Sequence, residues 1–200
     1  PSIDEKIDIL RRMDALGIKK ASIVGNSMGG VITLWTAMET PERVESMALL
    51  GTPGYPENRP KLLWPLSWPV LGPLYERILG ERVLRWIAQR TFVDKTVITE
   101  ELISEYTAPL RSREGRRAVA QFIRKALPSD WKERVASYST LRQPALVLVG
   151  SSDTLIDRAG GERLARDLGN ARFHYLDACG HSPQDDAPGR VIPLLTEFFA

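Results

Sequence analysis

Short runs of apolar residues that alternate with stretches of helical pattern are the feature that most constrains the fold of this chain. Between these runs, apolar residues recur at the spacing of a helix. Because strands with continuous apolar character are buried on both faces, the alternation predicts an α/β fold with a parallel sheet covered by helices. The runs interpreted as strands are Ala21–Val24, Val44–Leu50, Ala145–Val149 and Phe173–Leu176.

A long insert separates the second predicted strand from the third. It spans residues 55–138, contains half of the prolines and four of the five tryptophans, and includes no convincing strand. We interpret it as a helical cap over a core formed by residues 1–54 and 139–200. Its predicted helices are Glu81–Arg90, Thr99–Tyr106, Gly115–Ala126 and Asp130–Tyr138.

The composition is that of an ordinary globular protein, with 200 residues, 43% of them hydrophobic and 26% charged. A net charge of +2 is too small to indicate nucleic acid or an anionic membrane as a partner. No apolar run has the length of a membrane span. The single cysteine, Cys179, excludes an intrachain disulfide and fits a reducing compartment, so we expect a cytoplasmic protein. We expect its partner to be a small-molecule substrate. The oligomeric state stays open.

A glycine-flanked serine carries the strongest chemical signal. Gly25-Asn26-Ser27-Met28-Gly29 has the form G-x-S-x-G and lies where an apolar strand turns into a helix. A serine there adopts a strained turn that lifts its hydroxyl above the sheet edge, and its neighbours must be small because the backbone doubles back. We expect Gly29 and Gly30 to let the helix pack close to the strand. The amides at the start of the helix would favour developing negative charge.

A base must take the proton of such a serine, and the chain has two histidines. His174 lies inside the last predicted strand, where it is interpreted as a pleat residue. His181 follows that strand in a loop. Because ligands bind beyond the carboxyl ends of parallel strands, His181 is the candidate base.

The base in turn needs a carboxylate that fixes its tautomer. Asp153 follows the strand Ala145–Val149 and is the candidate acid. Asp157 is its rival, although capping of the next helix explains Asp157 equally well. Asp185 and Asp186 are interpreted as solvated charge near the start of the last helix.

These three segments resemble the catalytic segments of the α/β-hydrolase superfamily, in the superfamily's order of serine, aspartate and histidine. They are Gly25 to Gly30, Gly150 to Asp153, and Gly180-His181-Ser182-Pro183. The resemblance implies Ser27 as nucleophile, Asp153 as acid and His181 as base. It also implies that the Met28 backbone amide forms half of the oxyanion hole, and that residues 55–138 stand in the position of the family's cap.

The chain departs from the superfamily at its start. The superfamily normally has several strands before the nucleophile, together with a loop that donates a second oxyanion amide, but here Ser27 follows the first recognisable strand. We therefore expect an N-terminally truncated piece of the fold, with Ala21–Val24 as an unpaired edge and with little activity by itself, because loss of one oxyanion donor costs about 100- to 1000-fold in rate.

The leading functional expectation is hydrolysis of a carboxylic ester of an apolar substrate through an acyl-enzyme, without a cofactor or metal. Trp64, Trp68, Tyr75 and Trp86 of the insert are candidates to line the pocket. One alternative is hydrolysis of a carbon–carbon bond in ring-cleavage products, although that group usually has an aromatic residue where Ser182 stands. A non-catalytic binding protein is the other alternative. In a carbon–carbon hydrolase, a substrate carboxylate could be held by Arg111, Arg113, Arg116 or Arg117.

Overall fold

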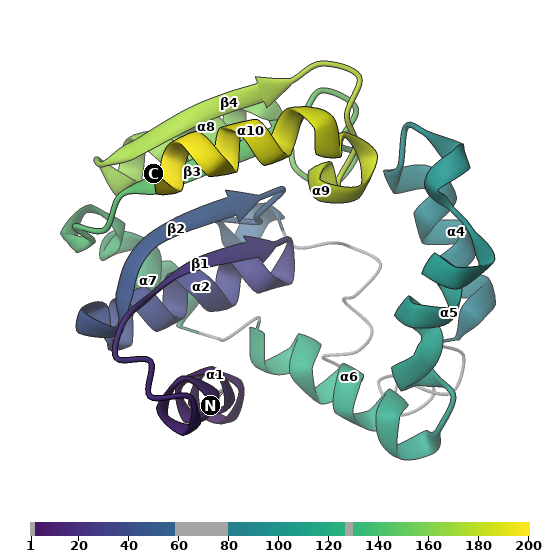
Figure 1. The fold of residues 1–200 in the computed structure, drawn as a ribbon, viewed down its shortest axis with the longest axis horizontal. Helices are drawn as coiled ribbons and strands as arrows, with labels where there is room; N and C mark the ends of the chain where they lie inside the picture. Colours follow the sequence, from purple (N-terminus) through teal and green to yellow (C-terminus); the bar gives the residue numbers. More distant parts are fainter. Residues whose placement is uncertain (1–2, 59–79, 127–129) are drawn as a thin grey trace.

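A four-stranded parallel sheet forms the centre of the computed structural model, which describes residues 3–58, 80–126 and 130–200. The strands are neighbours in the order of the sequence, β1-β2-β3-β4, and each pair is parallel (Figure 1). This confirms the predicted fold class. The strands are β1 (Ala21–Asn26), β2 (Val44–Leu50), β3 (Ala145–Gly150) and β4 (Ala171–Leu176).

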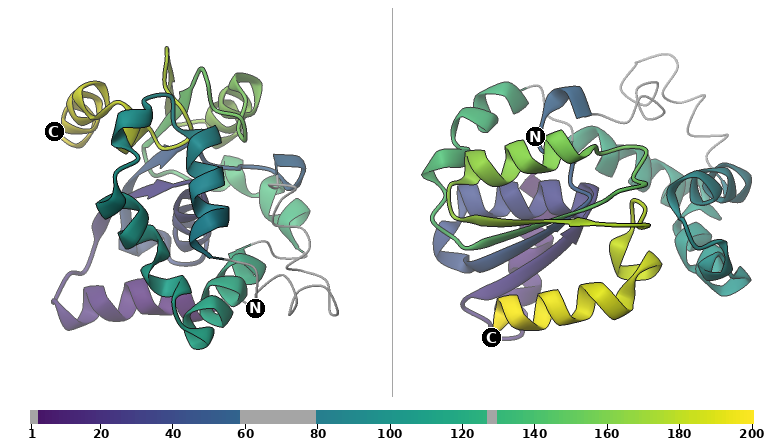
Figure 2. Two further views of the ribbon diagram at one scale, coloured as in Figure 1. Left: turned by 90° about the vertical axis from the view of Figure 1, so that its right-hand side faces the viewer. Right: turned by 90° about the horizontal axis from the view of Figure 1, so that it is seen from above.

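Helices cover the sheet on both sides because the strand side chains alternate between two apolar faces. On one face, Met47 and Leu49 of β2 pack with helices α2 (Met28–Glu39) and α8 (Arg158–Leu168). On the other face, Ala48 and Leu50 pack with helix α10 (Pro188–Phe199) (Figure 2). The central strands are therefore buried on both sides, as their continuous apolar runs predict.

Helix α1 (Ile3–Ala15) contacts α2 and leads through a loop into β1, the strand at the edge of the described sheet (Figure 1). Gly17 follows α1 with a φ of 69°, a left-handed conformation that glycine adopts without strain and that commonly ends a helix.

The described part of the insert contains only helical segments and loops. Helices α4 and α5 stand beyond the carboxyl ends of the strands, towards which the arrowheads point in Figure 1. Helix α7 returns to the core, where Trp131 packs edge to face on Trp35 of α2 with the ring centroids 5.8 Å apart. The assignment of residues 55–138 as a separate cap stays a prediction. The helices are α4 (Glu81–Thr91), α5 (Glu100–Thr107), α6 (Arg113–Ala126) and α7 (Trp131–Ala136).

Among the residues that the structure describes, no helix is both long enough and apolar enough to cross a bilayer.

Candidate active site

Ser27 sits at the turn between β1 and α2, with φ 52° and ψ −116°. Positive φ is rare for residues other than glycine and stores strain at functional sites. The backbone N–H of Ser27 donates to the carbonyl oxygen of Leu50 at 2.8 Å, which holds the turn against the end of β2. The strand-to-helix turn predicted from G-x-S-x-G is therefore present, with Ser27 at its apex.

Close packing explains two of the glycines around this turn, against backbone at Gly25 and against a side chain at Gly30. A Cβ atom on Gly25 would lie 2.5 Å from backbone atoms of Gly29 and Gly30, and one on Gly30 would lie 1.9 Å from Thr52 Oγ1. In contrast, a Cβ on Gly29 would meet nothing within 4 Å. The expectation that Gly29 serves close packing is therefore wrong, because the approach to the core falls at Gly30, on the next residue of α2.

His181 reaches the serine from the loop after β4. Its Nε2 atom lies 2.8 Å from Ser27 Oγ, and its Nδ1 atom lies 2.9 Å from Asp153 Oδ2. The imidazole side chain is 10% exposed and the Asp153 carboxylate is fully buried. Because an ionised carboxylate can only accept, Nδ1 carries the proton and Nε2 is free to accept the hydroxyl proton of Ser27.

Asp153 is itself held by backbone amides. Its Oδ1 atom accepts hydrogen bonds from the N–H groups of Leu155 at 2.8 Å and Ile156 at 3.0 Å, which leaves Oδ2 for His181. Asp157 faces elsewhere, because its carboxylate accepts from the N–H of Gly160 and caps α8. The structure thus brings Asp153 and not Asp157 to the histidine.

Two residues at this site carry no separate sequence prediction. Gly51 follows β2 with a φ of 51°, and a Cβ atom there would lie 3.1 Å from His181 Nδ1 and 3.2 Å from Asp153 Oδ2. The amide Nδ2 of Asn26 donates to the carbonyl oxygens of Leu50 at 3.0 Å and His181 at 2.9 Å. A glycine directly after a strand, and a polar residue directly before the serine, are the signals that point to these roles.

The interpretation of Asp185 and Asp186 as solvated charge is wrong. Both are partly buried in the short helix α9 (Pro183–Asp186) and contact the insert. Asp185 accepts a hydrogen bond from the hydroxyl of Tyr106 at 3.2 Å, and Asp186 accepts from backbone amides that follow α4. The insert lies outside the sequence neighbourhood of α9, so only the fold reveals these partners.

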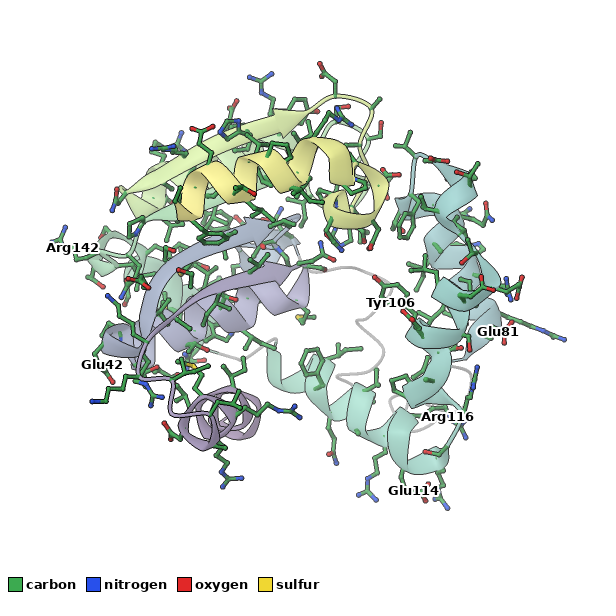
Figure 3. All side chains as sticks on the ribbon, in the orientation of Figure 1. Glu42, Glu81, Tyr106, Glu114, Arg116 and Arg142 are labelled. Carbon is green, nitrogen blue, oxygen red and sulfur yellow. The ribbon has the colours of Figure 1, made fainter. Side chains whose placement is uncertain are left out.

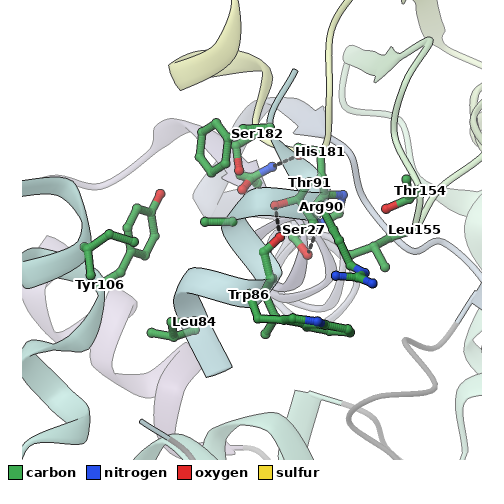
Figure 4. A pocket seen from close by; sticks show the side chains of 15 residues that line it. Ser27, Leu84, Trp86, Arg90, Thr91, Tyr106, Thr154, Leu155, His181 and Ser182 are labelled. Atoms are coloured by element: carbon green, nitrogen blue, oxygen red, sulfur yellow. Dashed lines mark hydrogen bonds between the residues drawn. The ribbon is translucent and has the colours of Figure 1, made fainter. Parts of the chain in front are cut away.

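A cavity of about 370 Å³ opens at Ser27 and His181 (Figure 4). Its walls come from the carboxyl edge of the sheet and from helices α4 and α5. Most of the lining is apolar, which suits a ligand with a hydrocarbon body. The lining residues are Asn26, Ser27, Leu84, Trp86, Ile87, Ala88, Arg90, Thr91, Phe92, Ile103, Tyr106, Thr154, Leu155, His181 and Ser182.

Arg90 brings a positive charge to this cavity. Its guanidinium carbon lies 4.0 Å from the centroid of the Trp86 ring. Of the four aromatic residues predicted to line the pocket, Trp86 is the one among the described residues, and it lines the cavity. Trp64, Trp68 and Tyr75 lie outside the described residues.

The four arginines suggested for a substrate carboxylate are not among the residues that line the described cavity. Arg111 donates to Ser104 Oγ at 2.6 Å, and Arg116 donates to the carbonyl oxygen of Leu110 at 2.7 Å. Figure 3 shows Tyr106 on the side of α5 that faces the sheet, with Arg116 further from it. Arg90 therefore replaces these arginines as the candidate.

No group of three or more histidine, cysteine or acidic side chains is placed to hold a metal ion in the ranges that the structure describes.

Comparison with known proteins identifies the class. The profile of the α/β hydrolase fold family matches residues 2–188, so the chain belongs to this family. Its fold and its serine–histidine–aspartate arrangement agree with that assignment.

Individual relatives show which hydrolases of this family the chain is similar to. Over 195 residues the chain is 34% identical to a 2-hydroxy-6-oxo-6-phenylhexa-2,4-dienoate hydrolase of Comamonas testosteroni, covering 93% of this chain and 65% of the relative. An uncharacterized hydrolase of Bacillus subtilis, YugF, is 27% identical over 187 residues, covering 93% and 67%. A solved meta-cleavage product hydrolase from Pseudomonas fluorescens superposes with a TM-score of 0.74 at 26% identity, covering 96% and 68%. The chain thus spans about two thirds of the length of these relatives.

Proposed function

We propose that this chain carries the active site of a serine hydrolase that cleaves a carbon–carbon bond beside a ketone, in a product of aromatic ring cleavage. The observation that carries the proposal is the hydrogen-bonded series Ser27–His181–Asp153 at the mouth of an apolar cavity that contains one arginine among its lining residues. Similarity to hydrolases of 2-hydroxy-6-oxo-dienoates supports the choice of substrate class. This reverses our order of preference from the sequence, in which ester hydrolysis came first.

The first step is attack on the ketone. His181 Nε2 takes the proton of Ser27 as Oγ forms a bond to the carbonyl carbon, and the carbonyl oxygen gains the negative charge. Asp153 stabilises the resulting imidazolium through Nδ1. The Met28 amide is the first N–H of α2 and has no carbonyl within its helix to bond, so we propose it as one donor to the oxyanion.

Collapse of this adduct breaks the carbon–carbon bond. The step acts on the 2-oxo tautomer of the substrate, in which the proton of the 2-hydroxyl group has moved to the carbon that departs. The electron pair of the broken bond moves to this carbon, where conjugation through the neighbouring double bond with the 2-oxo group spreads the charge, and His181 returns the proton to it. The acyl group stays on Ser27 Oγ. Water, activated by His181, then attacks this ester, and a carboxylic acid leaves while the serine is restored.

Arg90 provides the recognition step in this scheme. A ring-cleavage product carries a carboxylate at the end opposite its ketone, and Arg90 lines the same cavity as Ser27. Charge-assisted hydrogen bonds between arginine and a carboxylate are about twice as strong as neutral ones. The apolar wall would receive the hydrocarbon part of the substrate.

Ester hydrolysis is the second candidate, because the same serine, histidine and oxyanion donor cleave an ester by the same acyl-enzyme route. Ser182 favours it. This residue follows His181 and lines the cavity, at the position where carbon–carbon hydrolases usually carry an aromatic residue.

Parallel assays distinguish the two. The purified protein is given 2-hydroxy-6-oxo-6-phenylhexa-2,4-dienoate, whose conjugated chromophore disappears on cleavage, and p-nitrophenyl butyrate, with Ser27→Ala as the inactive control. We expect dienoate turnover with a higher kcat/KM than ester turnover. Arg90→Met should lower kcat/KM for the anionic dienoate by about 10- to 100-fold, since hydrogen bonds to charged groups contribute about 1.5–3 kcal/mol, and should spare the neutral ester. Turnover of the ester alone would assign the site to a carboxylesterase.

A further inference from the structure

The loop that carries His181 is in direct backbone contact with the end of α4. The N–H of His181 donates to the carbonyl oxygen of Thr91 at 2.9 Å. A Cβ atom on Gly180 would lie 2.0 Å from that same oxygen, so the residue before His181 has no room for a side chain. Thr91 and Phe92 also line the cavity, which means that one contact joins the histidine loop to the cavity wall.

The carboxylate of Asp186 spans this contact from the side. Its Oδ1 atom accepts hydrogen bonds from the backbone N–H groups of Val93 at 3.0 Å and Asp94 at 2.9 Å, just after α4. Its Oδ2 atom accepts from the N–H of Gly180 at 2.5 Å, next to His181. The two oxygens of one side chain therefore hold the insert and the histidine loop together.

We infer that Asp186 is a positioning residue, which sets His181 at its distance from Ser27 by fastening the histidine loop to the end of α4. The inference rests on the proposed roles of Ser27 and His181, but not on the identity of the substrate. Asp186 lies too far along the chain from α4 for sequence proximity to explain the contact, and its three amide partners come from both segments at once.

The chemistry of the contact requires a carboxylate. A carboxylate is acceptor-only, so both oxygens can face backbone N–H donors. In Asp186→Asn one oxygen becomes an NH2 group, which faces a donor whichever way the amide is turned. Because the N–H of Val93 also lies 3.2 Å from Oδ2, the variant loses its hold either on Gly180 or on Asp94, while the volume of the side chain stays nearly the same.

The test measures the rate at which a small fluorophosphonate labels Ser27, because this reaction needs the Ser27–His181 pair and no substrate recognition. We expect Asp186→Asn to slow labelling on the order of 10- to 100-fold, since a misplacement of about 1 Å can cost about 100-fold. Asp177→Asn is the matched control, because it removes an exposed carboxylate from the same loop and should label at the rate of the unmodified protein.

A second control separates positioning from loss of stability. Tyr138→Phe removes a buried hydroxyl that donates to the carbonyl oxygen of Gly54 and should lower Tm without slowing the labelling of the folded protein. For Asp186→Asn the labelling rate should fall at a temperature where circular dichroism shows a folded chain. For Asp186→Asn with p-nitrophenyl butyrate as substrate, kcat should fall by a larger factor than KM rises.

Gly180→Ala perturbs the contact between the histidine loop and Thr91 while Asp186 stays in place. This variant tests the inference if Asp186→Asn does not fold. Its methyl group displaces Thr91 from the histidine loop, so labelling should slow in the same range. Labelling at the unmodified rate in either folded variant would overturn the inference, as would unfolding of both, since the contact would then serve the fold itself. Failure to cleave the dienoate, with labelling intact, would instead refute the proposed substrate class.

Discussion

At the scale of single residues, the loop after β3 contains two aspartates with different partners. The side chain of Asp153 is fully buried and faces His181 Nδ1, while Asp157 accepts from the N–H of Gly160 at the start of α8. Both are short acidic residues in one loop, and only the hydrogen-bond partners separate an orienting carboxylate from a helix cap. Their replacement should therefore affect different properties of the protein.

We expect Asp153→Asn to lower kcat by about 10,000-fold with the fold unchanged, because an asparagine cannot hold the histidine tautomer that accepts from serine. Asp157→Ala should instead cost about 0.5–2 kcal/mol of stability through loss of the cap, with kcat preserved. Steady-state kinetics and thermal melts of the two variants check both halves. A large loss of kcat in Asp157→Ala would mean that the wrong acid has been chosen.

Cys179 allows a test of the loop that leads to His181. Burial, with a smaller contribution from the Asp186 carboxylate, raises the pKa of its thiol to about 11. A raised pKa keeps the thiol protonated until the pH approaches that value, and the thiolate is the reactive form. We expect almost no reaction with a disulfide reagent at pH 8 in the native state and rapid reaction in denaturant. Fast native labelling would show that this loop opens in solution.

At the scale of elements, hydrophobic periodicity predicts which segments are buried strands and helices. It does not predict the ends of elements that depend on pairing between distant segments. The strand Val44–Leu50 has the predicted bounds, because continuous apolar character marks it. Strand β4 begins two residues early, at Ala171, because it pairs there with Ala145 of β3. Helix α2 begins at Met28, directly after Ser27, although two glycines of low helix propensity lie in its first turn.

The residues of the site likewise fall into those that the sequence identifies and those that only the fold reveals. Serine, histidine and aspartate could be identified from strand ends, because parallel strands bring their carboxyl ends to one edge. The partners of Asp185, Asp186 and Arg90 could not, because each contact joins segments that are far apart in sequence or depends on where the insert lies.

The two glycines at the start of α2 should respond differently to alanine. Gly30→Ala places a methyl group 1.9 Å from Thr52 Oγ1, and overpacking of this kind costs about 1–3 kcal/mol. Gly29→Ala meets open space, and alanine in a helix is favoured over glycine by about 0.5–1 kcal/mol. The free energy of unfolding measured by denaturant titration should therefore fall in Gly30→Ala and rise in Gly29→Ala. Equal destabilisation would mean that α2 packs more closely on β1 at Gly29 than the geometry indicates.

At the scale of the whole molecule, the insert is joined to the core at both ends of its described part. Near α4, the Asp186 carboxylate of the core accepts from the N–H of Val93, and the carbonyl oxygen of Thr91 accepts from the N–H of His181. Near its end, the Trp131 ring packs on Trp35 within the main apolar cluster of the sheet. A cavity walled by both parts keeps its shape only while these contacts hold, so the stability of the insert and that of the core should be coupled.

Two tryptophans of the insert test this coupling. Trp131 is fully buried, while Trp86 is 48% exposed on the cavity wall. Truncation of a buried tryptophan costs about 3–5 kcal/mol, and about 2–4 °C of Tm accompanies each kcal/mol in a chain of this size, so Trp131→Ala should lower Tm by roughly 6–20 °C. Trp86→Ala should stay close to the unmodified Tm, because it leaves no cavity in the core. Far-UV circular dichroism and tryptophan fluorescence should report one shared transition in the unmodified protein, and Trp131→Ala should shift both signals together. If Trp131→Ala instead splits the transition in two, with the sheet melting at the original temperature, the insert unfolds on its own and the coupling inferred from the Trp35 contact is absent.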